Sequence, residues 1–558
     1  MSSISRRTFL GTGAVAAGAM GIGAISPAMA EGEKANRVIV GDLHQEDVDA
    51  SCVELEPITE FADEQTFDIV VVGAGVAGVP AVLTALEEGA TVACLQKTGG
   101  VSANGFGFSC VVGGASNEAG KSRWMSDWAR LNDWRINPTL FRHYMDHSEE
   151  AISWIIERAD EVGLEFVSYS TDSSIRYDDG GVVAVCDGTT PGNQMLMTAL
   201  AEKAEAEGAK FFYKTPCVQL VQEEDGTVTG AIGKTKDGSY IKLNATKGVI
   251  LCCGDYMNNE PMLNRYLPDG NMFPLCLVDH TGDGHILGTL AGGRIAPLGH
   301  PRQIHTNYIG PLMFWPFLAL DYDGTRFCNE TIPMSSLNVA MARTYKLDHF
   351  GRHYRIFDAA MAEKYPGCVP ASYVEAEMAE SSNVWASANL YAKGDTLEEL
   401  VANAGMPEEA VASIERWNEM CAQGRDDDFG VPGSVLKPID TPPFYALIGD
   451  VGMSGINAGV MVDGNYQVID ANDNPIPGLY AAGIDAGNAC GGLNWNMPGG
   501  FSNGGFYTAG RYSVIHALTG GAQASKPCCF DEICDRFRGP DGAFAWELDT
   551  CANAITVW

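Results

Sequence analysis

Three closely spaced glycines give the first sign of chemistry in this sequence. Gly73, Gly75 and Gly78 follow the apolar run FDIVVV and precede a segment with helical periodicity, with Ala74 and Ala77 in the same turn. Glycine here permits a tight turn and a close approach of the backbone to a pyrophosphate, while the start of the helix supplies amide N–H groups and a positive dipole. The pattern predicts a dinucleotide-binding turn; a similar turn without a ligand is the alternative.

The second strand of this unit ends without the acidic residue that usually binds a ribose. Gln96 stands in that place, and Lys97 follows it. A carboxamide can still hydrogen-bond to ribose hydroxyls, although without the strength of a charge-assisted bond. Because FAD and NAD share the glycine pattern, the choice of cofactor has to come from residues further along the chain.

Five later segments indicate which cofactor is bound. They are, in order, KTGGVSANGFG (97–107), TKGVILCCGDYMNNEPM (246–262), HTGDGHILGTLAGG (280–293), DGTRFCNE (323–330) and IPGLYAAG (476–483). Over roughly residues 66–515 the series resembles the fumarate reductase/succinate dehydrogenase flavoprotein family, in the soluble single-subunit branch that includes urocanate-type reductases, 3-ketosteroid dehydrogenases and cardiac glycoside reductases. The resemblance implies FAD and an α/β fold, in which a discontinuous Rossmann-like FAD-binding domain carries an inserted α+β capping domain.

The resemblance also implies which residues contact FAD. The glycine turn would meet the pyrophosphate, and Gln96 and Lys97 would lie near the adenosine ribose. Amides of Ser502 and Asn503, at the start of the last helix, would stabilise anionic reduced flavin. An acidic residue usually follows the position of Gly483, where this chain has Ile484. The other implied FAD contacts are Asn104, Gly105, Gly107, Val218, Gly254, Asp283 and Gly483.

The chain departs from this family at the residues that would bind a substrate. Fumarate reductases carry arginines at the positions of Met334 and Met497, and ketosteroid dehydrogenases carry tyrosines there. Paired histidines of the family correspond to about Ser454 and Gly455. Methionine neither binds a carboxylate nor donates a proton, but it forms an adaptable apolar wall. We therefore expect a largely apolar substrate beside Met334, Met497 and Gly499, with ordinary core packing as the alternative for the methionines.

Reduction of a double bond also needs a proton donor. His305, in RQIHTN, lies within one residue of a family histidine that contacts substrate, so it is the leading candidate for the catalytic acid. His280 and Tyr256 are weaker candidates in neighbouring motifs. A group with a pKa near neutrality would suit the role.

Charge and cysteine content limit the other possibilities. The sequence has 36 basic and 71 acidic residues, a net charge of −35, which disfavours nucleic acid and anionic membranes as partners. Among 16 cysteines, a C-terminal group could form disulfides, stay free or bind a [4Fe–4S] cluster, although its spacing matches no established cluster pattern. These weak candidate ligands are Cys528, Cys529, Cys534 and Cys551, and we expect no metal site elsewhere.

The N-terminus indicates export. Twin arginines in SISRRTFLG, a Gly/Ala-rich run and the small-residue sequence SPAMA resemble a Tat signal ending at residue 30, and no later stretch is long and apolar enough to span a bilayer. We therefore predict a protein on the extracytoplasmic face of the membrane or in the periplasm. The predicted divisions are residues 1–30 (signal), 31–65 (N-terminal extension), 66–300 and 441–523 (FAD-binding domain), 301–440 (capping domain) and 524–558 (Cys-rich tail).

Together these features predict an exported FAD-dependent oxidoreductase acting on CH–CH groups. We expect it to reduce an activated C=C bond in an enone, unsaturated lactone or unsaturated acid. Electrons would come from a membrane-anchored cytochrome or a similar donor, because no CxxCH haem motif and no second dinucleotide motif is present. The alternatives are a dehydrogenase that introduces a C=C bond and a non-catalytic flavin electron carrier.

Overall fold

The structure is a computed structural model of the chain. It describes residues 37–38, 53–166, 175–273, 279–296, 299–306, 312, 315–332, 334–341, 351–380, 391–487, 489–491, 495, 497, 499–521, 523–525 and 527–528. The predicted signal at 1–30, most of the predicted extension at 31–65, and Cys529, Cys534 and Cys551 lie outside the described residues.

An eight-stranded sheet forms the centre of the larger part of the molecule. Its main path runs β10-β11-β12-β3-β4-β9, with β21 beside β12 and β20 beside β21. Strands β12, β3, β4 and β9 are parallel, and β21 is parallel to β12. β-branched residues of β3 from Ile69 to Val72 are buried, which is expected for the central strand of a covered parallel sheet. The strands are β3 (Asp63–Val72), β4 (Val92–Gln96), β9 (Lys210–Tyr213), β10 (Cys217–Gln222), β11 (Val228–Lys234), β12 (Tyr240–Leu251), β20 (Gln467–Ile469) and β21 (Pro475–Ala481).

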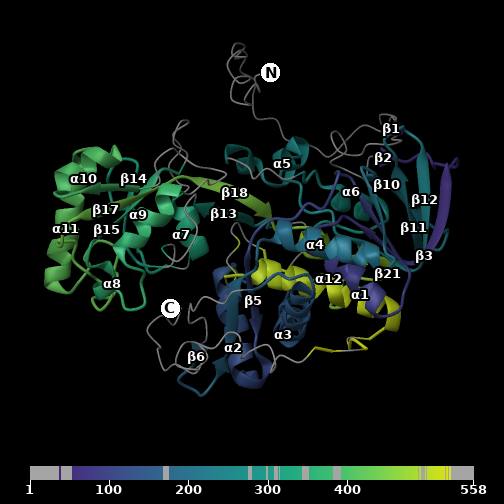
Figure 1. The fold of residues 1–558 in the computed structure, drawn as a ribbon, viewed down its shortest axis with the longest axis horizontal. Coiled ribbons are helices and arrows are strands. Elements are labelled where there is room, and N and C mark those ends of the chain that lie inside the picture. The colour runs from purple at the N-terminus through teal and green to yellow at the C-terminus, as the bar shows by residue number, and fades with distance from the viewer. Residues whose placement is uncertain are drawn as a thin grey trace, which may run out of the picture.

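Four helices support this sheet and the strands beside it. They are α1 (Gly78–Glu87), α3 (Pro138–Glu161), α4 (Asn193–Ala206) and α12 (Phe501–Thr519), and α12 contacts both α1 and α3 (Figure 1). Helix α3 begins at Pro138, and the Asn137 side chain caps it by accepting hydrogen bonds from the amides of Thr139 and Leu140. Helix α2 (Glu118–Leu131) packs against α3. Strand β5 (Gly107–Val111) pairs with β8 (Val185–Thr189) in a two-stranded ribbon that also contacts α3.

A second, smaller sheet lies at the other end of the molecule (Figure 1). Its order is β14-β15-β17-β16 and every pair is antiparallel. Helices α10 (Leu397–Ala404) and α11 (Glu409–Gln423) cover one face, and an aromatic cluster around Phe317, Phe357 and Tyr445 covers the other. This is the α+β capping part, and its sheet extends past residue 440, because β17 pairs with β15. The strands are β14 (Leu318–Asp321), β15 (His353–Asp358), β16 (Tyr391–Gly394) and β17 (Phe444–Gly449).

A two-stranded antiparallel ribbon joins the two parts. Strand β13 (Arg302–Thr306) pairs with β18 (Val451–Ile456), and α7 (Met334–Met341) contacts β13. The remaining elements are β1 (Arg37–Val38), β2 (Val53–Glu54), η3 (Gly113–Ala115), β6 (Ile175–Arg176), β7 (Val182–Val183), α5 (Glu260–Tyr266), η4 (Pro268–Met272), α6 (Asp283–Leu290), α8 (Met361–Lys364), α9 (Ala371–Glu380), β19 (Val460–Met461), η6 (Gly483–Asp485) and β22 (Ala486–Gly487).

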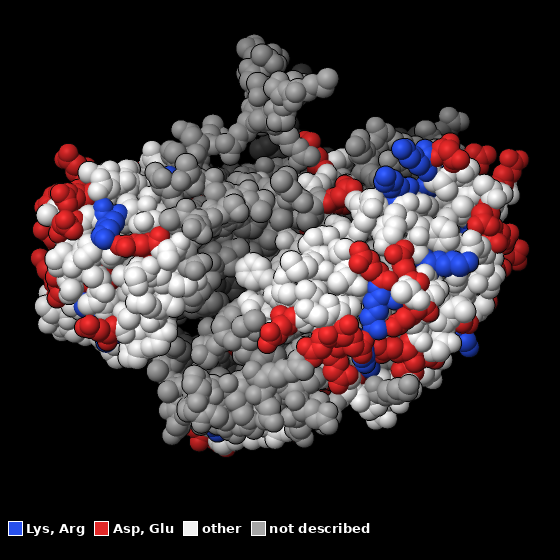
Figure 2. Space-filling model, in the orientation of Figure 1, with Lys and Arg blue, Asp and Glu red and all other residues white. Residues whose placement is uncertain are grey.

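The surface reflects the acidic composition. On the face shown in Figure 2, carboxylate side chains gather on both parts of the molecule, while the fewer basic side chains stand mostly beside them. Among the described residues, no helix combines the length and the apolar character that crossing a membrane requires.

Candidate active site

The glycine turn between β3 and α1 is shaped to receive a phosphate group. Gly73 has φ = 103°, and a side chain there would collide with the backbone of Cys252, while one at Gly78 would collide with the Gly73 carbonyl. No side chain caps α1, and no hydrogen bond within the described chain uses the amides of Gly75, Val76 or Ala77. Unsatisfied amides at a helix start form an anion site, so the turn fits the FAD pyrophosphate.

Gln96 supports this turn from behind. Its side chain is buried, its Oε1 accepts the Ala74 amide at 2.9 Å, and its Nε2 donates to Thr98 Oγ1 at 2.5 Å and to the Gly100 carbonyl at 3.1 Å. Both ends of the carboxamide therefore bind the chain itself. Lys97 reaches Asp283, with Nζ 3.3 Å from Oδ2, so two predicted cofactor residues from distant motifs meet.

Two further predicted contacts lie at strand ends around this turn. Gly483 (φ = 70°) follows β21, and a Cβ placed on it would lie 3.0 Å from Ala77 Cβ. Gly254 (φ = 83°) follows β12 and lies against the His280 ring. Val218 is buried on β10, an outer strand of the same sheet. Because the carboxyl ends of β3, β12 and β21 meet here, the arrangement matches the usual ligand position in such sheets.

The start of α12 gathers a second group of predicted residues. Gly500 begins the helix with φ = 72° and no side-chain cap. Asn503 Nδ2 donates to the Gly107 carbonyl at 2.5 Å and lies beside Gly105. Asn193, which the sequence did not single out, donates to the Asn104 carbonyl at 2.9 Å and accepts from the Tyr507 hydroxyl. An uncapped helix start suits a group that gains negative charge.

Gln303 connects the joining ribbon to this helix start. Its Nε2 donates to Ser502 Oγ at 3.1 Å, a contact that the sequence motifs did not indicate. His305 is two residues further along β13, so both side chains lie on the same side of the strand. Burial lowers the pKa of His305 to about 4, and no hydrogen bond from the described residues reaches its ring. His305 is therefore neutral at neutral pH.

The two weaker acid candidates lie on either side of Asp255, which precedes Tyr256 in the chain and contacts His280. Tyr256 is fully buried, its hydroxyl is 2.5 Å from His300 Nδ1, and burial raises its pKa well above the ordinary value. His280 Nδ1 is 3.3 Å from Asp255 Oδ1, and its ring lies against Gly254. Neither shares a strand with His305, but the Asp255 carboxylate beside His280 accepts the amide of Ile456 on β18, the strand that pairs with β13.

The predicted substrate-pocket residues occupy different surroundings. Met497 is buried among aromatic side chains that include Trp495 and Phe501, and Asn132 Nδ2 donates to its sulfur at 3.8 Å. Gly499 is exposed, and a Cβ there would meet no atom within 4 Å. Met334 is the first residue of α7, the helix that contacts β13.

Cys528 contacts carboxylates, and no second cysteine is recorded beside it in the described chain. Its Sγ lies 3.0 Å from Glu157 Oε2, and burial together with Glu157 raises the pKa of the thiol to about 12. No group of three or more potential metal ligands occurs among the described residues. Cys529, Cys534 and Cys551 are outside this part, so the iron–sulfur suggestion stays a prediction.

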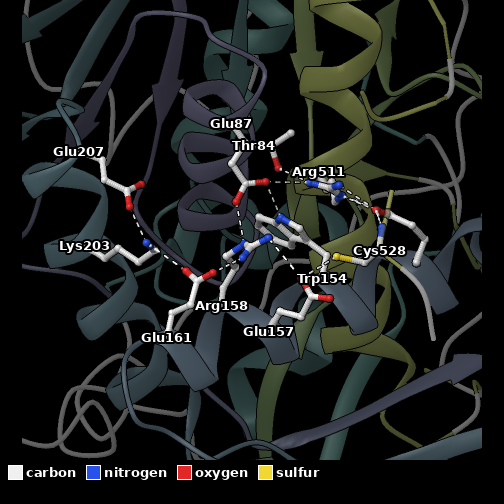
Figure 3. A network of polar contacts seen from close by, with 11 residues as sticks. Thr84, Glu87, Trp154, Glu157, Arg158, Glu161, Lys203, Glu207, Arg511 and Cys528 are labelled. Carbon is white, nitrogen blue, oxygen red and sulfur yellow. Dashed lines mark hydrogen bonds and ion pairs between the residues drawn. The ribbon is translucent and has the colours of Figure 1, made fainter. Parts of the chain in front are cut away.

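A polar network holds α12 in place (Figure 3). The Arg511 guanidinium is buried, pairs with Glu150 at 2.7 Å and stacks on Trp154 with its Cζ 4.6 Å from the ring centroid. Trp154 Nε1 in turn donates to Glu87 Oε2 at 2.7 Å. These contacts fix α12 against α3 and α1, and with it the helix start that carries Ser502 and Asn503.

Comparison with known proteins identifies the family. The chain belongs to the FAD binding domain family, which matches residues 68–502. It therefore binds FAD and is an FAD-dependent oxidoreductase, in agreement with the fumarate reductase-type resemblance. It is 28% identical to a vinyl phenol reductase of Lactiplantibacillus plantarum over 82% of this chain and 97% of that protein. It is 27% identical to a urocanate reductase of Eggerthella lenta over 76% of this chain and 70% of that protein.

The fold has counterparts among solved structures. An open flavocytochrome c3 fumarate reductase superposes with a TM-score of 0.59 at 22% identity, covering 82% of this chain and 79% of the other. A 3-ketosteroid-Δ4-(5α)-dehydrogenase from Rhodococcus jostii superposes with a TM-score of 0.60 at 22% identity, covering 83% and 98%. Both likenesses support the α/β fold of this chain.

Proposed function

We propose that this protein reduces an activated C=C bond in a largely apolar organic substrate. The observation that carries the proposal is methionine at both positions where fumarate reductases place arginine, with Met497 buried in an aromatic cluster. Methionine at these two positions offers a dicarboxylate no positive charge. Vinyl phenol and urocanate, which the two relatives named above reduce, are both unsaturated and carry an aromatic ring.

The chain's own residues have separate roles in this reaction. Bound FAD would supply hydride chemistry, held by the turn at Gly73–Gly78 and by the start of α12. The unsatisfied amides at that helix start favour negative charge on the bound group. Gln303 orients Ser502. His305, on the same side of β13, is the proposed acid: negative charge on the bound group would raise its pKa, so that the ring takes up a proton from solvent and then donates it to the substrate.

The opposite reaction direction is the second candidate. The chain is 27% identical to a 4-oxocyclohex-2-ene-1-carboxylate 5-dehydrogenase of Sinomonas cyclohexanicum over 53% of this chain. Two assays separate the directions: substrate reduction with an artificial low-potential donor, and substrate oxidation with an acceptor dye. Faster oxidation of the saturated compound would contradict the reductase proposal.

Export and an external electron donor complete the proposal. The twin arginines Arg6 and Arg7 support Tat export, and the missing haem motif supports a separate donor such as a membrane-anchored cytochrome. Cell fractionation tests the first point. Replacing both arginines with lysine should retain the protein in the cytoplasm, whereas unchanged export would exclude the Tat route.

A further inference from the structure

His285 and Asp485 form a buried pair where the cofactor-binding segments meet. Both side chains are fully buried, and His285 Nδ1 lies 3.4 Å from Asp485 Oδ1. The other carboxylate oxygen accepts the Cys253 amide, while the other ring nitrogen of His285, Nε2, faces the carbonyl oxygen of Ala458. Neither His285 nor Asp485 belongs to the site that the sequence predicts.

These surroundings favour a charged histidine. A carbonyl oxygen and a carboxylate accept hydrogen bonds, so a proton on each ring nitrogen of His285 suits both neighbours. The 3.4 Å between Nδ1 and Asp485 Oδ1 is an ion-pair distance, not a hydrogen bond. Burial by itself would lower the pKa of His285, but hydrogen bonding and the charge of Asp485 outweigh it, and the pKa is raised. The other titratable groups around the ring are Asp255, Tyr256 and His300.

The pair lies where segments from distant places in the chain meet. Asp485 ends η6, next to Gly483, and it binds the backbone just after β12 through Cys253. His285 belongs to α6, whose first residue, Asp283, pairs with Lys97 after β4. Gly284 leaves room for the carboxylate, since a side chain at that position would collide with Asp485. Gly483 in turn lies against Ala77 of the glycine turn.

We propose that the His285–Asp485 pair is a positioning device for FAD, which holds these strand ends at the spacing that the cofactor needs. Protonated His285 keeps η6, α6 and the end of β12 together. In neutral His285 one ring nitrogen carries a lone pair, which would face either the Ala458 carbonyl or the Asp485 carboxylate and weaken the contact with it. FAD affinity then depends on the protonation of a histidine that does not itself have to touch the cofactor.

The sign of the pH dependence follows from the direction of the pKa shift. The folded-state pKa of His285 lies above the value of about 6.5 for an unperturbed histidine. The contribution of the pair is therefore complete below about pH 6.5 and is lost as the pH rises through the folded-state pKa. With one linked proton, the Kd for FAD can rise by at most about tenfold per pH unit above that pKa.

The test measures FAD rebinding to the full-length apoprotein by flavin fluorescence between pH 6 and pH 9.5. The wild-type Kd should rise with pH. His285→Gln, which can satisfy only one of the two acceptors, should bind FAD about tenfold or more weakly at pH 6 and lose this rise. Asp485→Asn keeps the shape but removes the charge and should behave in the same way.

His353→Gln is the matched control. His353 is also fully buried, but it lies in the capping sheet, and burial lowers its pKa to about 4. This variant should keep the wild-type dependence of the FAD Kd on pH. A wild-type Kd that is constant across the range would overturn the proposal, as would an Asp485→Asn variant with the wild-type profile. Because no turnover is measured, either result leaves the proposed reductase function standing.

Discussion

In the proposed reaction, Met497 and His305 are the two single residues with the clearest roles. Met497 lies inside an aromatic cluster and makes a polar contact with Asn132, and its thioether offers no charge to a substrate carboxylate. His305 has no partner among the described residues and is neutral at neutral pH. In the proposed reaction Met497 therefore affects the choice of substrate, and His305 affects proton transfer.

Met497→Arg should destabilise the protein without creating a fumarate reductase. A guanidinium in this cluster would be buried without a carboxylate, which costs on the order of 3 kcal/mol of unfolding free energy. Urea unfolding measures the loss, and Met497→Leu, a change that conserves volume, should cost less than about 1.5 kcal/mol. A stable Met497→Arg protein with strong fumarate reduction would show that this position faces the substrate and accepts a carboxylate.

His305→Ala should lower kcat for the unsaturated substrate by about 10²- to 10⁴-fold, because general acids contribute that much to proton transfer. FAD content should not change, since His305 lies outside the glycine turn. His305→Gln keeps an N–H donor, and any recovery of activity with it measures the hydrogen-bonding part of the role. Equal kcat in wild type and His305→Ala would remove His305 from the mechanism.

At the scale of elements, the sequence predicts the β3–α1 turn and the start of α12 because both depend on local backbone requirements. Gly73 needs a positive φ, and the helix beginning at Phe501 follows a glycine pair. Asn193 and Gln303 could not be predicted in this way, because their contacts join segments that are far apart in the sequence. The His285–Asp485 pair was missed for the same reason: Asp485 lies one residue beyond the usual acidic position.

Gly75→Val should abolish FAD binding while the fold is retained. A Cβ at this position would already lie 3.0 Å from the Ser102 carbonyl, and the larger side chain would fill the space through which the backbone approaches a pyrophosphate. Flavin absorbance per mole of purified protein measures the effect. Gly114→Val, where a Cβ meets no atom within 4 Å, is the control and should retain FAD. Stoichiometric FAD in Gly75→Val would refute the assignment of the turn.

Arg511→Met should lower the free energy of unfolding by about 3 kcal/mol. The change leaves Glu150 without its buried partner and removes the contact that holds α12 on α3. Arg416→Met is the matched control, because Arg416 pairs with Glu419 and Asp428 in an exposed position, where solvent screens such pairs and the loss should be much smaller. Equal losses in the two variants would mean that the network of Figure 3 does not stabilise the helix.

At the scale of the whole molecule, the buried histidines predict a loss of stability in acid. Burial lowers the pKa of both His300 and His353 to about 4, so the folded protein keeps them neutral while the unfolded chain binds protons below about pH 6.5. Stability should therefore fall as the pH decreases from about 6.5 to about 4. Urea unfolding at several pH values measures this slope, and His353→Gln should reduce it. A slope that is unchanged in this variant would contradict the lowered pKa of His353.

The two-part architecture gives the central proposal its physical basis. In our proposal FAD lies between the strand ends of the large sheet and the start of α12. The β13–β18 ribbon, which joins the two parts (Figure 1), carries His305 and Gln303, and Gln303 contacts Ser502 at the start of α12. The resemblance in sequence predicted an FAD-binding domain with a capping domain. It did not predict the β13–β18 pairing or the contact between Gln303 and Ser502, which the structure shows.

The most direct measurement is anaerobic stopped-flow reoxidation of the dithionite-reduced protein by vinyl phenol, urocanate and fumarate, followed by mass spectrometry of the products. We expect rapid reoxidation by at least one of the two aromatic unsaturated compounds, with a product heavier by two hydrogen atoms, and slow or no reoxidation by fumarate. Faster reoxidation by fumarate, or reoxidation that leaves every double bond intact, would contradict the proposed function.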